Sequence, residues 1–108
     1  MAKLENYLET YRKRDGLSQR EIAFLLGAQS GAKVCRYERF VREPSLATAL
    51  AYEAIFKRSV SELFPGLYQK VEGEVAERAQ ILISKKDYAN PNQQIARKRE
   101  ALASLLIN

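Results

Sequence analysis

A short segment near the middle of the chain, residues 28–42, concentrates positive charge. It holds one acidic residue, Glu38, against four basic ones, namely Lys33, Arg36, Arg39 and Arg42. The chain of 108 residues has a net charge of +5, so this segment, at +3, holds most of the excess. Lys and Arg side chains neutralise phosphate groups, and Arg also hydrogen-bonds the edge of guanine. The segment therefore indicates a surface for an acidic partner, above all nucleic acid.

Other chemistry finds little support in the residue types. The chain has no His and one Cys, Cys35, so a His-based triad, a His metal site and an internal disulfide are excluded. No carboxylate pair, nucleophile–base pair, Gly-rich phosphate loop or metal-binding cluster stands out. We expect a protein that is not an enzyme and needs no cofactor or metal. Cys35 is expected to be a packing residue, the alternative being a redox-responsive thiol beside Arg36.

Cysteine use and hydropathy bear on the compartment. A single Cys fits a reducing environment. No apolar run approaches the roughly 18 residues that a membrane span needs. The N-terminal residues enter a charged helical pattern at once, which argues against a signal peptide. We expect a cytoplasmic, nucleoid-associated protein with no membrane partner.

The hydrophobic pattern predicts an all-α protein, because apolar residues recur at helical spacing and strand signals are nearly missing. A first helix is predicted from Leu4 to Arg14, ended by Asp15 and Gly16. A second follows Ser18, which forms a predicted capping box with Glu21.

The next predicted elements are equally short. The second helix ends at Gly27, and Ser30 caps a third over residues 31–38. Ser45 caps a fourth helix over residues 46–56. A fifth turn over residues 61–64 is ended by Pro65 and Gly66. These five elements form a predicted domain over residues 1–66.

Residues 67–108 form a predicted C-terminal helical extension of about two helices. The first covers residues 67–85, and the second begins with Asn90 as cap and Pro91 at the first helical position. Their apolar stripes either pack within the extension or mediate dimerisation. The candidate dimerisation residues are Tyr68, Val71, Val75, Leu82, Leu102, Leu105 and Leu106.

Two short helices joined by a turn, the second one basic, are typical of a helix-turn-helix. Residues 4–64 resemble the lambda-repressor-like (Cro/repressor-type, xenobiotic-response-element) family of helix-turn-helix regulators. The matching residues are Arg12, Gly16-Leu17-Ser18-Gln19, Glu21-Ile22-Ala23, Leu26-Gly27, Val34, Arg36-Tyr37-Glu38, Pro44-Ser45-Leu46, Ser59 and Ser61-Glu62-Leu63-Phe64. This resemblance implies a five-helix domain with the third helix in the major groove of DNA.

The resemblance also implies roles for single residues. Gln19 and Ser30 would contact the DNA backbone, and Arg12 would form a structural ion pair with Glu38. Arg36 is the strongest candidate for reading a base. The other implied DNA-binding residues are Gly31 and Ala32 at base-reading positions, and Lys33, Arg39 and Arg42 at phosphates.

The chain departs from the family pattern in four respects. It has one additional residue between Gly27 and Glu38, which we place in the turn; within the third helix it would shift every base contact by one position. Phe40 stands where Gly is usual. Glu53 replaces a usually buried Ala, which puts the packing of the fourth helix in question. Phe24 and Leu25 replace polar residues; they are either exposed singly or, as we expect, covered by the C-terminal helices.

Together these features predict a sequence-specific regulator of transcription that binds double-stranded DNA, acting as a homodimeric repressor on a palindromic operator. The alternative is a DNA-binding antitoxin or accessory factor whose C-terminal helices bind a partner protein.

Overall fold

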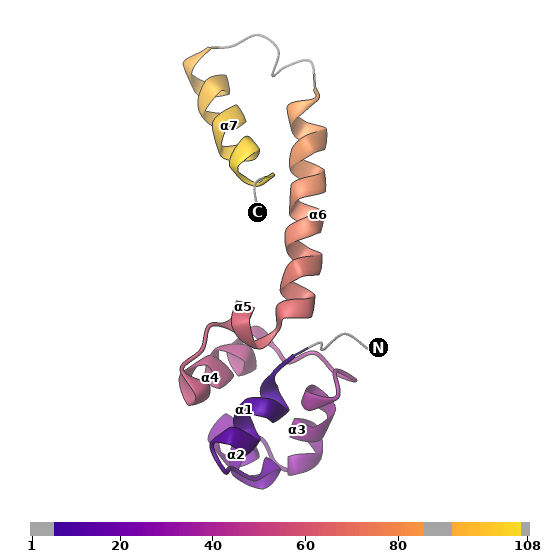
Figure 1. The fold of residues 1–108 in the computed structure, drawn as a ribbon, viewed down its shortest axis with the longest axis vertical. Coiled ribbons are helices and arrows are strands. Elements are labelled where there is room, and N and C mark those ends of the chain that lie inside the picture. The colour runs from indigo at the N-terminus through magenta and orange to yellow at the C-terminus, as the bar shows by residue number, and fades with distance from the viewer. Residues whose placement is uncertain (1–5, 86–91, 107–108) are drawn as a thin grey trace. The chain divides into compact units, whose positions relative to one another are not determined.

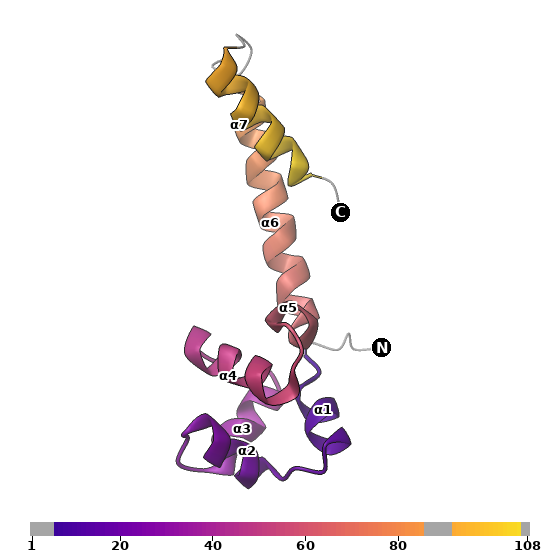
Figure 2. The same ribbon diagram turned by 90° about the vertical axis from the view of Figure 1, so that its left-hand side faces the viewer.

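The computed structural model describes residues 6–85 and 92–106, and these residues form seven helices and no strand. The predicted all-α class is thereby confirmed. Contacts divide the chain into two compact units, Met1–Tyr68 and Gln69–Asn108 (Figures 1 and 2). The division lies two residues after the predicted one. The first unit contains α1 (Leu8–Arg14), α2 (Gln19–Leu26), α3 (Gly31–Glu38), α4 (Leu46–Phe56) and α5 (Val60–Leu63).

The start of α1 differs from the prediction. The helix begins at Leu8 rather than Leu4, which lies outside the described residues. Asn6 explains this, because its buried side chain accepts a hydrogen bond from Leu8 N (3.1 Å) and donates one to Tyr37 O (3.0 Å). A contact with a residue so distant in sequence leaves no local signal. The end of α1 agrees with the prediction, since Gly16 takes a left-handed φ of 71°.

Helices α2 and α3 have the predicted bounds. Ser18 and Glu21 form the capping box of α2, in which Glu21 N donates to Ser18 Oγ (3.0 Å) and Ser18 N to Glu21 Oε1 (2.9 Å). Gly27 ends the helix with a φ of 73°. α3 is α-helical throughout Gly31–Glu38. Ser30 occupies the N-cap position of α3, but its hydroxyl forms no capping hydrogen bond, contrary to the prediction.

The core of the first unit lies where α2 packs on α3 and α4. Apolar side chains from each helix meet there, and the largest fully buried ones are Tyr52, Leu8, Ile22, Leu63 and Val34. Such burial supplies most of the free energy of folding, at roughly 25 cal/mol per Å² of apolar surface. The core therefore fixes the position of α3 from its Val34 and Tyr37 side.

The departures Phe40 and Glu53 are both accommodated. Phe40 adopts a left-handed φ of 57° although it is not Gly, and so ends the turn after α3 at some cost in strain. Glu53 is half-buried, and its carboxylate accepts a hydrogen bond from Val60 N (2.9 Å). The acidic side chain thus links α4 to the first residue of α5.

The helix predicted over residues 67–85 is present, but its bounds differ from the prediction. α5 ends at Leu63, and α6 (Pro65–Ile83) begins at the Pro65-Gly66 pair that was expected to end an element. Pro suits the first turn of a helix, where its missing N–H has no intrahelical partner to lose. α6 continues through the division at Tyr68 into the second unit.

The second unit consists of the rest of α6 and α7 (Gln93–Ser104). Asn92 caps α7, because its Oδ1 accepts from Ile95 N (2.9 Å). The helix therefore begins two residues later than predicted; the expected cap Asn90 and Pro91 lie outside the described residues. Among the described residues of this unit, Ala79 is the buried apolar one.

Candidate nucleic-acid interface

α3 presents one buried and one exposed face. Val34 and Tyr37 are buried in the core, whereas Ala32 and Arg36 are exposed. Lys33 and Cys35 are half-buried. Beyond the helix, Arg39 and Arg42 are also exposed. The fold therefore leaves the guanidinium groups of the 28–42 segment accessible to a partner.

Glu38, the acidic residue of that segment, is removed from the surface. Its Oε2 accepts from Arg12 Nε (2.6 Å) and its Oε1 from Arg12 Nη2 (3.1 Å). The side chain of Glu38 is 3% exposed and that of Arg12 is 12% exposed. The hydrogen bond to Glu38 raises the pKa of Arg12. This pair joins α1 to the end of α3, and every exposed charge of residues 28–42 is positive.

The same arginine holds the connection between α1 and α2. Arg12 Nη1 donates to Leu17 O (3.1 Å), next to the cap of α2. One guanidinium group thus contacts the loop before α2 and the last residue of α3. Its geometry fixes both helices with respect to α1.

Gln19, the first residue of α2, has a partner that sequence reasoning missed. Its Nε2 donates to Glu38 Oε1 (3.0 Å). Glu38 therefore accepts from both Arg12 and Gln19, and Gln19 is half-buried rather than free. Their positions at the start of α2 and the end of α3 contain no pattern that signals this bond.

The start of α3 lies close to the start of α2. A Cβ at Gly31 would meet the backbone N of Arg20 and the backbone carbonyl carbon of Gln19, each at 3.4 Å. A side chain at position 31 would therefore point to α2. Ser30, by contrast, is exposed, and its hydroxyl is not used in capping.

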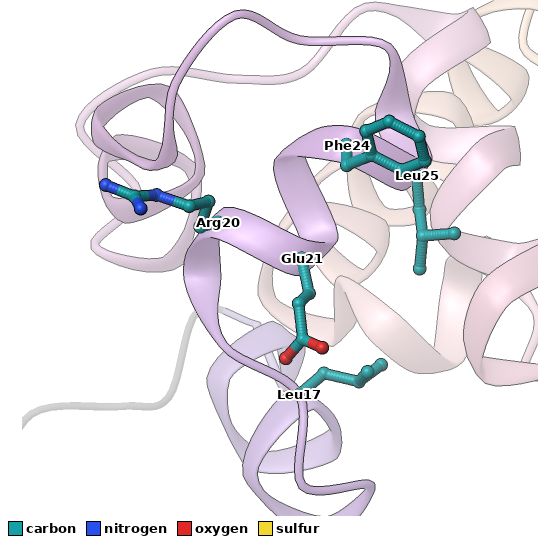
Figure 3. Close-up of a pocket in the computed structure, with 5 residues that line it drawn as sticks. All are labelled: Leu17, Arg20, Glu21, Phe24 and Leu25. Atoms are coloured by element: carbon teal, nitrogen blue, oxygen red, sulfur yellow. The ribbon is translucent and has the colours of Figure 1, made fainter.

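A shallow hollow of about 330 Å³ lies on the outer side of α2. Figure 3 shows its lining residues, which come from α2 and the loop before it: Leu17, Arg20, Glu21, Phe24 and Leu25. Phe24 is 83% exposed and Leu25 is 53% exposed. Other residues of the first unit thus leave both side chains largely uncovered.

The candidate dimerisation residues of the second part of the chain are partly exposed. Val71, Val75 and Leu82 on α6 are exposed, as are Leu105 and Leu106 after α7. Leu102 is half-buried, and Tyr68, at the end of the first unit, is exposed. Ile81 on α6 is 55% exposed and was not among the predicted residues.

Within residues 6–85 and 92–106, no group of three or more Cys, Asp or Glu side chains is arranged to hold a metal ion. None of the helices in that part of the chain is long and apolar enough to cross a membrane. Comparison of the chain with protein-family models, curated proteins and solved structures finds no match.

Proposed function

We propose that the first unit binds double-stranded DNA with α3 in the major groove, and that the protein regulates transcription, most simply as a repressor. The observation that carries the proposal is the charge of the α3 segment. Arg36, Arg39 and Arg42 are exposed, while the opposing Glu38 is buried against Arg12. Duplex DNA carries a negative charge on each phosphate, so a surface of one positive sign attracts it strongly.

In this proposal the basic residues have two different roles. Arg36, on the exposed face of α3, reads a base by donating two hydrogen bonds to guanine O6 and N7. Lys33, Arg39 and Arg42 bind phosphates, which adds affinity without sequence preference. Ser30 and Gln19 add backbone contacts at the starts of α3 and α2. Gly31 contributes by closeness to α2 rather than by a side chain.

We further propose that two copies act together. A single recognition helix reads only part of a site, and two copies about 34 Å apart would read a palindrome of one helical turn. Apolar residues on α6, including Val71 and Ile81, are exposed. Their exposure supports the proposal, because a second copy of the chain would cover them. The same residues also support the second candidate function, a DNA-binding antitoxin or accessory factor, in which a different protein covers them.

Selection from a pool of random duplexes tests the DNA-binding proposal. The selected duplex and a scrambled one of equal length are then titrated with the protein at several salt concentrations. We expect enrichment of a two-fold symmetric sequence, and for both duplexes an affinity that falls with salt. Failure to bind any duplex at low salt would overturn the proposal. Sedimentation of the purified protein separates the two candidates, since a repressor of this kind is a homodimer by itself.

A further inference from the structure

We propose that Glu38 is a positioning residue that fixes the side-chain amide of Gln19 for a phosphate contact. The inference rests on the proposed function and adds a residue to it that touches no DNA itself. It begins from the bond between Gln19 Nε2 and Glu38 Oε1, at 3.0 Å. This bond joins the first residue of α2 to the last residue of α3.

The chemistry of the two groups determines how the amide is turned. An ionised carboxylate only accepts hydrogen bonds, so the NH₂ group of Gln19, and not its carbonyl oxygen, faces Glu38. Arg12 holds the carboxylate of Glu38 in place by donating two further hydrogen bonds to it. The amide of Gln19 is therefore hydrogen-bonded to a carboxylate that Arg12 fixes in position.

The NH₂ group has two hydrogens, and Glu38 accepts one of them. The second N–H remains for another acceptor, and the half-buried Gln19 lies at the N-terminus of α2. Free backbone N–H groups at a helix start already favour a phosphate there. A glutamine that is fixed before binding loses less side-chain entropy when it donates to that phosphate.

The proposal makes a prediction opposite to that of simple electrostatics. Glu38→Gln removes a negative charge from a protein that binds a polyanion, which should strengthen binding. If Glu38 instead orders Gln19, the same change weakens binding, because an amide at position 38 can turn its own NH₂ group to Gln19. Glu9→Gln is the matched control: it removes the same charge from the exposed Glu9–Lys13 pair on α1.

The experiment combines these variants with Gln19→Ala in the full chain. We expect Gln19→Ala and Glu38→Gln each to lower affinity for the selected duplex about tenfold, the value of one hydrogen bond to a charged group. The double variant should bind no more weakly than either single variant. Glu9→Gln should not weaken binding. In NMR spectra of the free protein, the Gln19 side-chain amide signals should move with Glu38→Gln and not with Glu9→Gln.

Additive losses in the double variant, or a gain of affinity with Glu38→Gln, would overturn the proposal. The proposal would also be overturned if the side-chain amide signals of Gln19 did not shift in the Glu38→Gln variant. If Glu38→Gln does not fold, the double variant Arg12→Met/Glu38→Met takes its place, because apolar side chains of similar volume restore the packing while Gln19 still loses its acceptor. If the wild-type protein binds no duplex at all, the proposed function fails first, and the Gln19 signals still report separately on the bond to Glu38.

Discussion

Arg12 and Glu38 join α1 to the end of α3 through two parallel hydrogen bonds, with Nε–Oε2 at 2.6 Å and Nη2–Oε1 at 3.1 Å. The pair has two effects on the α3 segment. It fixes the C-terminal end of the helix to the rest of the first unit, and it buries the negative charge of residues 28–42. The structure and the proposed electrostatics of this surface thus depend on the same contact.

Breaking this pair from one side should destabilise the first unit. Glu38→Ala leaves the Arg12 guanidinium nearly buried without its carboxylate, and we expect a loss of about 3–5 kcal/mol in the free energy of unfolding. The double variant Arg12→Met/Glu38→Met should recover most of it. Urea unfolding followed by tyrosine fluorescence measures both. A double variant as unstable as Glu38→Ala would show that the ion pair itself, and not the burial of an unpaired charge, is what matters.

Tyr52 should tolerate the loss of its hydroxyl group. Its Oη is buried and has no hydrogen-bond partner among the described residues. Tyr52→Phe should therefore leave the free energy of unfolding unchanged or raise it by up to about 1 kcal/mol. A loss of more than about 2 kcal/mol on urea unfolding would mean that the hydroxyl has a partner, such as a buried water.

The same tyrosine should make the protein sensitive to alkali. Burial, followed by the Glu38 carboxylate, raises the pKa of Tyr52 above its ordinary value of 10.0. The unfolded chain then loses this proton at a lower pH than the folded one, so stability is complete below pH 10 and falls as the pH rises above it. Unfolding curves between pH 9 and 12 should show a smaller decline for Tyr52→Phe than for the wild type. Equal declines in the variant and the wild type would show that the pH dependence does not come from Tyr52.

Arg42→Ala should weaken DNA binding without changing base preference. A phosphate contact contributes through counterion release, so its loss should lower the slope of log affinity against log salt by about 0.9. Titration of the selected and scrambled duplexes at four salt concentrations measures the slope, with Arg78→Ala on α6 as a control for charge. A change in preference between the duplexes would assign Arg42 to base reading instead.

The apolar residues of α6 should control self-association. Val71→Asp/Val75→Asp places charges among side chains that the proposal puts at the dimer contact, and we expect it to convert a dimer into a monomer. Val41→Asp, a similar change at an exposed valine of the first unit, should leave the dimer intact. Sedimentation velocity at tens of micromolar protein distinguishes these cases. A monomeric wild type, with and without DNA, would contradict the homodimer.

Local signals were sufficient for α2 and α4. Ser18 with Glu21 marks the start of α2 and Gly27 its end, and Ser45 caps α4. The errors occurred where the decisive contact is distant or the signal has two meanings. The side chain of Asn6 donates a hydrogen bond to Tyr37 O, far along the chain, and α1 begins only after it, at Leu8. A Pro-Gly pair can stand either after the end of a helix or at its start, and here Pro65 is the first residue of α6.

The candidate site was also only partly predictable. The basic residues and the pairing of Arg12 with Glu38 could be proposed from residue types and from the family resemblance. The bond from Gln19 to Glu38 could not, because it depends on how α2 and α3 pack. The closeness of Gly31 to the start of α2 likewise could not be predicted, because it depends on how the two helices pack.

Base preference of Arg36→Ala tests the central claim most directly. The variant and the wild type are each titrated against the selected duplex and against duplexes with single base-pair changes, at one fixed salt concentration. If α3 reads the major groove through Arg36, the variant loses about 5- to 150-fold in affinity for the selected duplex and no longer discriminates at one base pair of each half-site. If Arg36→Ala keeps the full base preference of the wild type, α3 does not read DNA in the proposed register.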